Sequence, residues 1–158
     1  MFAVENHLLT RNGTPVRQAP AKFHGGTIPV EWIVMHYTAG RSFQADLASL
    51  TAANPPGSAH VLIGQLGEVV QMLPFNVEAY HAGASSFAGV SGFNKRSVGI
   101  ELSNPGALTR VNNADWKTWY GVQIQAAGAV AARHKKTPDV DNGWIPYPEV
   151  QLNLAAEI

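Results

Sequence analysis

The chain has 158 residues, the size of one ordinary domain, and its 46% hydrophobic and 14% charged residues argue against intrinsic disorder. Eleven basic residues balance eleven acidic ones, which disfavours an electrostatically driven nucleic-acid binder and a polybasic membrane binder. There is no cysteine, which excludes disulfides and Cys ligands or nucleophiles, and no apolar run approaches the ~20 residues that a membrane span needs.

The first third of the chain predicts an extended arm followed by a strand and a helix. Residues 1–30 are rich in Gly, Pro and polar residues and predict an arm with turns. Residues 32–37 form a nearly continuous apolar run, which predicts a central strand covered on both faces. Ser42 is expected to cap a short helix that begins at Phe43.

The remaining elements predict a mixed α/β fold. Strands are expected over 59–63, 69–73 and 97–102, with a hairpin turn between the first two. Helical character is expected around Trp116–Tyr120 and over 122–134, and a last helix after Pro148. The fold class is therefore α/β, a central mixed β-sheet flanked by α-helices, in one domain over residues 1–158.

His36 is the first candidate for chemistry. It lies near the end of the predicted strand, and the ends of strands in open sheets are where sites tend to lie. An imidazole there can ligate a metal in a fixed orientation, but the spacing alone fits a core histidine that is bonded to a backbone carbonyl at least as well.

Glu101 is the second candidate, because it interrupts an apolar strand. Burial of its carboxylate would raise its pKa and suit a general base. A glutamate that faces water at a strand edge is the competing interpretation, and the pattern favours neither.

Other polar and aromatic residues carry weaker signals. His60 and His81 are more readily explained as structural than as catalytic residues. The Asn94–Arg96 patch is usually a solvated turn, although it can hold a carboxylated ligand. Trp116, Trp119, Tyr120 and Trp144 can stack on sugar rings, but the spacing of the first three is more typical of a core.

Four blocks in this order and spacing resemble one family. They are residues 33–40 (IVMHYTAG), 58–76 (SAHVLIGQLGEVVQMLPFN), 80–89 (YHAGASSFAG) and 94–106 (NKRSVGIELSNPG). Together they are similar to the zinc-dependent N-acetylmuramoyl-L-alanine amidases of the amidase-2 type, relatives of phage lysozyme-type amidases and peptidoglycan recognition proteins. The strong similarity covers about residues 30–110.

The resemblance implies the fold, the reaction and the site. It implies cleavage of the amide between N-acetylmuramic acid and L-alanine in peptidoglycan or muropeptides. By matching positions, His36 is the first zinc ligand, Glu101 is the general base, and His81 and Asn94 line the substrate groove. The mechanism expected is a zinc-activated water that is deprotonated by Glu101.

The sequence departs from the family where the remaining zinc ligands are expected. In the family, a segment after the last long helix carries the second zinc-binding histidine and the acidic third ligand. No segment similar to it is found in this sequence. Three explanations stay open: the missing segment is supplied elsewhere, for example by a second chain; a substitute ligand such as His134 or Asp139 is used; or the chain is a catalytically inactive domain that only binds peptidoglycan. The domain is therefore expected to be incomplete at its C-terminus, and the first ten residues, which do not read as a signal peptide, predict a cytoplasmic location.

Overall fold

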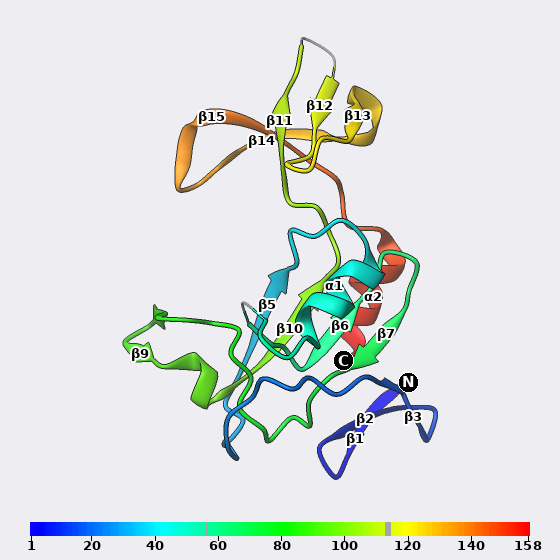
Figure 1. The fold of residues 1–158 in the computed structure, drawn as a ribbon, viewed down its shortest axis with the longest axis vertical. Helices are drawn as coiled ribbons and strands as arrows, with labels where there is room; N and C mark the ends of the chain where they lie inside the picture. Colours follow the sequence, from blue (N-terminus) through cyan, green and yellow to red (C-terminus); the bar gives the residue numbers. More distant parts are fainter. Residues whose placement is uncertain (56, 113–114) are drawn as a thin grey trace.

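A five-stranded mixed sheet forms the centre of the computed structural model, which describes residues 1–55, 57–112 and 115–158 (Figure 1). β10 (Ser97–Leu102) pairs in parallel with both of its neighbours, β5 (Trp32–Tyr37) and β6 (Val61–Ile63), and β6 pairs in antiparallel orientation with β7 (Val69–Gln71). Along the sheet the strands are β4 (Arg17–Gln18), β7 (Val69–Gln71), β6 (Val61–Ile63), β10 (Ser97–Leu102) and β5 (Trp32–Tyr37). The predicted strands and their hairpin are confirmed, and so is the mixed sheet.

One helix packs on each face of this sheet. On one face, α1 (Phe43–Leu50) buries Phe43 and Leu47 against Leu62, Val70 and neighbouring residues. Its N-terminus is capped as predicted, because the Ser42 hydroxyl accepts a hydrogen bond from the Ala45 amide at 3.3 Å.

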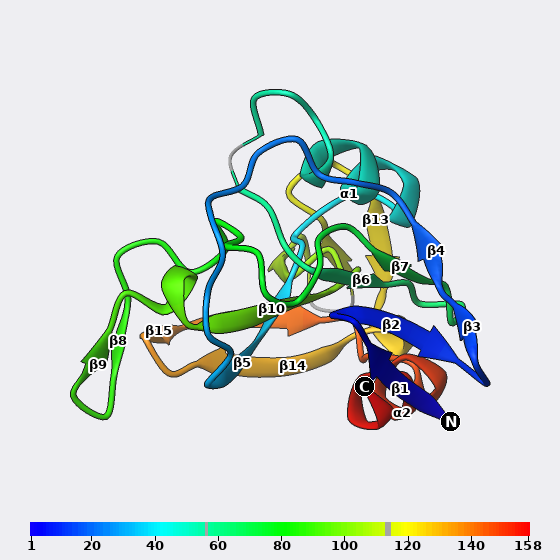
Figure 2. The ribbon, with the colours of Figure 1, turned by 90° about the horizontal axis from the view of Figure 1, so that it is seen from below.

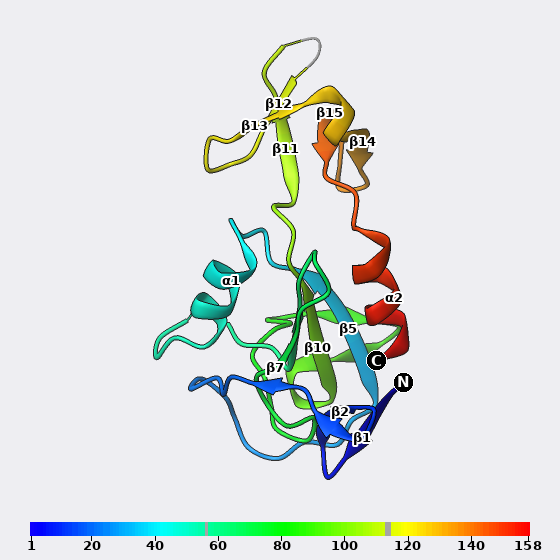
Figure 3. The same ribbon diagram turned by 90° about the vertical axis from the view of Figure 1, so that its right-hand side faces the viewer.

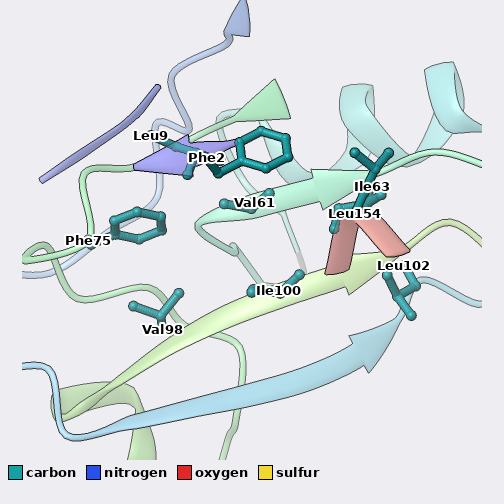
Figure 4. Packing of buried hydrophobic residues seen from close by; sticks show 9 residues of the cluster. All are labelled: Phe2, Leu9, Val61, Ile63, Phe75, Val98, Ile100, Leu102 and Leu154. Atoms are coloured by element: carbon teal, nitrogen blue, oxygen red, sulfur yellow. The ribbon is translucent and has the colours of Figure 1, made fainter. Parts of the chain in front are cut away.

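On the other face, α2 (Glu149–Glu157) contributes Leu154 to a second apolar cluster (Figure 4). The last helix was predicted, and its Leu154 packs in a cluster whose remaining members are Phe2, Leu9, Val61, Ile63, Phe75, Val98, Ile100 and Leu102. A sheet with helices on both faces is the fold class expected from the sequence. The two described helices have 8 and 9 residues, and neither is long and apolar enough to cross a membrane.

The prediction that residues 32–37 form a central, doubly covered strand is wrong. β5 lies at the edge of the sheet, beside β10. Its residues alternate in exposure, and Ile33, Met35 and Tyr37 are 58%, 47% and 43% exposed on one face. The alternate residues, among them His36, point to the face that carries α1 and are partly buried.

The predicted helices over 116–120 and 122–134 are also wrong, because this region forms a second five-stranded sheet. Figures 1 and 3 show it standing apart from the central sheet. Two chain segments connect it to the rest of the molecule, one after β10 and one before α2. Trp116 is only 3% exposed, and its indole lies where a Cβ on Gly143 would stand. Packing of this tryptophan on a glycine overrides helical propensity. The strands in order are β13 (Gln123–Gln125), β12 (Asp115–Lys117), β11 (Ala107–Arg110), β15 (Thr137–Trp144) and β14 (Val130–His134), with a 3₁₀ turn over Ala126–Gly128.

The N-terminal residues and the segment before β10 hold the smaller elements (Figure 2). The first strands form a separate sheet of β1 (Phe2–Glu5), β2 (Leu8–Arg11) and β3 (Thr14–Pro15). The loop before β10 carries a two-stranded hairpin, β8 (Ser86–Phe87) and β9 (Val90–Ser91), and a 3₁₀ turn over Phe93–Lys95.

Candidate active site

His36 and Glu101 are direct neighbours across the sheet. Parallel pairing of β5 with β10 sets His36 opposite Glu101, so both side chains lie on the face that carries α1. One carboxylate oxygen of Glu101, Oε2, is buried and has no hydrogen-bond partner among the described residues. Burial, with a smaller contribution from the charge of Asp46, raises the pKa of Glu101 to about 7. Of the two interpretations left open by the sequence, the structure shows the buried carboxylate.

His81 completes the cluster from the loop before β8. Its Nδ1 lies 2.9 Å from Nε2 of His36. The ring lies directly on Gly99 of β10, where a Cβ would stand 2.5 Å from the imidazole Cγ. A glycine is therefore required at the point where this loop crosses the sheet.

The hydrogen-bond partners of the two imidazoles assign their protons. Ser97 Oγ donates to the Phe93 carbonyl at 2.6 Å, so it can only accept from His81 Nε2–H, 3.2 Å away. His81 Nδ1 is then unprotonated and accepts from His36 Nε2–H. The nitrogen of His36 that keeps a free lone pair is therefore Nδ1. Burial lowers the pKa of both histidines, that of His81 to about 4, which favours these neutral forms.

Asn94 holds the loop that carries His81. Its Oδ1 accepts from the backbone amides of His81 and Ala82 at 3.1 and 2.7 Å. Arg96, from the same patch, forms an ion pair with Glu31 at 3.2 Å. In the structure, Asn94 acts on the site by positioning His81.

His60 is fully buried and structural in its contacts. Its Nε2 donates to the Val77 carbonyl at 2.8 Å, and its Nδ1 accepts from the Gly99 amide at 3.0 Å. Burial lowers the pKa of His60 to about 4, because the charged form would lose its hydration. Both ring nitrogens are satisfied, as expected for a core histidine.

A cavity of about 460 Å³ opens beside Glu101, a size typical of sites for small ligands. Its wall includes His81, Asp46, Thr38, Arg41 and Trp119. Asp46 is 4% exposed, and its Oδ2 accepts from Thr38 Oγ1 at 2.8 Å and Ser103 Oγ at 2.5 Å.

In the sequence analysis, Trp119 was named only for stacking on sugar rings, and Thr38, Arg41 and Asp46 were missed. The available signal was Asp46, a charged residue in the apolar stripe of α1 between Phe43 and Leu47.

The proposed substitute ligands do not reach this cluster. His134 and Asp139 lie in the exposed β14–β15 hairpin of the second sheet, and neither lines the cavity at Glu101. Over residues 1–55, 57–112 and 115–158, no group of three or more His, Asp or Glu side chains is placed to hold a metal ion. His36 Nδ1 and the free oxygen of Glu101 fall short of the three protein ligands of a catalytic zinc site, so the described residues do not make one.

Comparison with known proteins decides the family. The family model described as N-acetylmuramoyl-L-alanine amidase (Amidase_2) matches residues 26–143, about three quarters of the chain. The chain belongs to the Amidase_2 family. The matched range contains His36, His81 and Glu101 as well as most of the second sheet.

Curated relatives agree with the Amidase_2 assignment. The 1,6-anhydro-N-acetylmuramyl-L-alanine amidase AmpD of Escherichia coli K12 is 37% identical over 89 residues, 56% of this chain and 46% of the relative. The N-acetylmuramoyl-L-alanine amidase AmiD of the same strain is 31% identical over 121 residues, 70% of this chain and 43% of the relative. The chain thus spans less than half of either relative. Neither the family match nor these relatives point to a second chain as the source of the missing ligands.

Solved structures share the fold. A selenomethionine crystal structure of AmpD superposes with a TM-score of 0.53 at 27% identity, over 64% of this chain and 65% of that one. A complex of E. coli AmiD with anhydro-N-acetylmuramic acid-L-Ala-D-gamma-Glu-L-Lys gives a TM-score of 0.54 at 21% identity, over 99% of this chain and 49% of that one. The second likeness shows the fold alone. The amidase-2 fold expected from the sequence blocks is confirmed.

Proposed function

We propose that this chain hydrolyses the amide bond between N-acetylmuramic acid and L-alanine in peptidoglycan or muropeptides, with Glu101 as the general base. The observation that supports it is the buried, unpartnered Glu101 carboxylate at the wall of a ligand-sized cavity, next to His36, in a chain of the Amidase_2 family. The relatives AmpD and AmiD are both named as amidases that act on this bond.

The environment of Glu101 suits a group that first takes and then gives a proton. A pKa of about 7 keeps a substantial fraction ionised at neutral pH and still makes the protonated form accessible. The carboxylate accepts a proton from water as the water oxygen bonds to the amide carbonyl carbon. It then gives this proton to the alanine nitrogen as the carbon–nitrogen bond breaks, which leaves a lactyl carboxylic acid and a free alanyl amine.

Zinc is part of this proposal through His36. Amidase-2 enzymes are generally zinc enzymes, and His36 has one nitrogen free beside the Glu101 carboxylate. Because the described residues do not complete a zinc site, the proton steps above depend on Glu101 alone. His81 is proposed to line the substrate groove, since it lines the cavity beside Glu101. Asn94, expected from the resemblance to line the groove too, is not among the residues that line this cavity, and its proposed role is to hold the loop of His81.

The proposal has a direct test. The chain is incubated with N-acetylmuramoyl-L-alanyl-D-isoglutamine in a buffer that contains zinc, and the products are followed by mass spectrometry. Release of L-alanyl-D-isoglutamine by the wild type, and its loss in Glu101→Gln with an unchanged circular dichroism spectrum, supports the proposal. If Glu101→Gln keeps full activity, the general base is another group.

A further inference from the structure

The second sheet contributes Trp119 to the wall of the cavity that Glu101 also lines. The turn between β12 and β13 places Trp119 at the cavity, and two backbone hydrogen bonds hold this turn: Thr118 N to Val122 O at 2.9 Å and Gly121 N to Thr118 O at 3.0 Å. Gly121 has φ of +96°, a conformation that favours glycine. Trp119 is therefore presented by a well-defined turn.

Trp119 connects this turn to the segment that follows β5 by a hydrogen bond. Its indole Nε1 donates to the carbonyl of Ala39 at 2.7 Å, although 61% of the residue stays exposed. Ala39 has φ of +50°, an uncommon conformation for a residue with a Cβ. The β12–β13 turn thus contacts the segment after β5 at the wall of the cavity, three residues after His36.

Arg41 lies with its guanidinium against two aromatic rings, those of Trp119 and Tyr120. Its guanidinium carbon lies 5.3 Å from the ring centroid of Trp119 and 5.7 Å from that of Tyr120. The two rings are themselves perpendicular, at 89° and 5.2 Å. Cation–π contacts of this kind fix the direction of a guanidinium and leave its N–H groups free to donate.

No carboxylate of the described residues neutralises Arg41. The ion pairs in the part of the chain that the structure describes are Arg96–Glu31 and Arg133–Asp141. The other acidic residue of the cavity, Asp46, is already bonded to the hydroxyls of Thr38 and Ser103. Arg41 is exposed, lies against two aromatic rings at the wall of a ligand-sized cavity and has no acidic partner among the described residues, so it is suited to bind a carboxylate of the ligand through two N–H groups.

We propose that Arg41, oriented by Trp119 and Tyr120, is a specificity subsite for the free α-carboxylate of the second residue of the stem peptide. The inference rests on the proposed function, which places the lactyl–alanine amide at Glu101. The α-carboxylate of the residue that follows alanine lies ~7 Å along an extended chain from the scissile bond. Glu101 and Arg41 line the same cavity. The subsite favours glutamate over isoglutamine at that position, because isoglutamine carries a neutral amide in place of the α-carboxylate and keeps only its side-chain carboxylate.

Two ligands that differ in one group test the proposal. N-Acetylmuramoyl-L-alanyl-D-isoglutamate and the corresponding D-isoglutamine compound share the side-chain carboxylate of the second residue and differ in having an α-carboxylate or an α-amide. Both are titrated into the Glu101→Gln protein by calorimetry, so that neither is hydrolysed. The ligand with the α-carboxylate is expected to bind about tenfold more tightly, the lower end of what a hydrogen bond to a charged group contributes. Arg41→Gln is expected to abolish the difference, and Arg41→Lys to restore part of it. The difference is also expected to shrink at high salt.

The matched control is Arg133→Gln, which removes an exposed arginine of the second sheet that is paired with Asp141. It is expected to leave the ratio of the two affinities unchanged. Trp119→Phe, which loses the bond to Ala39, is expected to lower the ratio without abolishing binding.

The outcomes separate the two claims. Equal binding of both ligands, unaffected by Arg41→Gln, overturns the subsite and leaves the proposed function standing. Binding of neither ligand overturns both. A preference that survives Arg41→Gln assigns the carboxylate to another residue and also overturns the subsite.

Discussion

Replacement of Glu101 by glutamine tests the burial of its carboxylate without any substrate. In the folded chain the pKa of this group is raised from its ordinary 4.5 to about 7, so the native state keeps a proton that the unfolded state has already lost between these values. Ionisation of Glu101 therefore opposes folding. Its cost is absent below pH 4.5, grows as the pH rises, and is complete above pH 7.

The magnitude follows from the size of the shift. One pKa unit corresponds to ~1.4 kcal/mol, so ionised Glu101 costs ~3 kcal/mol in the metal-free protein. Glutamine has nearly the same shape and never ionises. The free energy of unfolding of Glu101→Gln, relative to wild type, is thus expected to rise by ~2.5 kcal/mol between pH 5 and pH 8.

Urea unfolding at four pH values, with a chelator to remove metal, measures this difference. The low pKa values of His60 and His81 destabilise both proteins equally below pH 6.5 and cancel in the comparison. Glu157→Gln, at an exposed residue of α2, is the control and is expected to stay within ~0.5 kcal/mol at every pH. A flat difference for Glu101→Gln from pH 5 to pH 8 would refute the buried carboxylate.

Three further predictions concern the histidine cluster. Gly99→Ala is expected to cost ~1–3 kcal/mol in urea unfolding because its Cβ would overlap His81, whereas Gly26→Ala, with no atom within 4 Å of the new Cβ, is expected to be neutral. Nitrogen-15 NMR of the metal-free chain at pH 7.5 is expected to show His36 protonated at Nε2. His81→Leu should let both tautomers of His36 populate while His81→Asn retains an acceptor, and a His36 protonated at Nδ1 in the wild type would contradict the network. Any zinc that the purified chain binds is expected to be lost in His36→Ala; retention measured by atomic emission would exclude His36 as a ligand.

Local sequence was sufficient for the elements whose apolar pattern is strong. The strand over 97–102, the capped helix after Ser42 and the last helix after Pro148 were all predictable, because each depends on its own residues. The exposure of β5 was not predictable, because its apolar run fits a central strand equally well. The order of strands in the sheet, with β5 paired only to β10, shows that β5 is an edge strand.

The second sheet shows why the helix prediction failed. The alanines over 126–132 have high helical propensity, but the region is held by long-range contacts such as Trp116 on Gly143. Such contacts join residues far apart in the chain and leave no periodic signal in either segment.

The candidate site was predictable in part. His36 and Glu101 could be singled out because each is a titratable residue within an apolar strand. Their adjacency, and the position of His81 on Gly99, depend on pairing between distant strands and on a loop that crosses the sheet. The roles of Arg41, Asp46 and Trp119 depend on where α1 and the second sheet meet the cavity, which no local pattern encodes.

The measurement that most directly tests the central claim is single-turnover hydrolysis of N-acetylmuramoyl-L-alanyl-D-isoglutamate by the wild type and by Glu101→Gln, in zinc-containing buffer. The account predicts that the wild type releases a peptide with a free alanine amino group and that Glu101→Gln binds the compound but leaves it intact. A wild-type chain that binds the compound and never cleaves it would contradict the account and identify a binding domain instead.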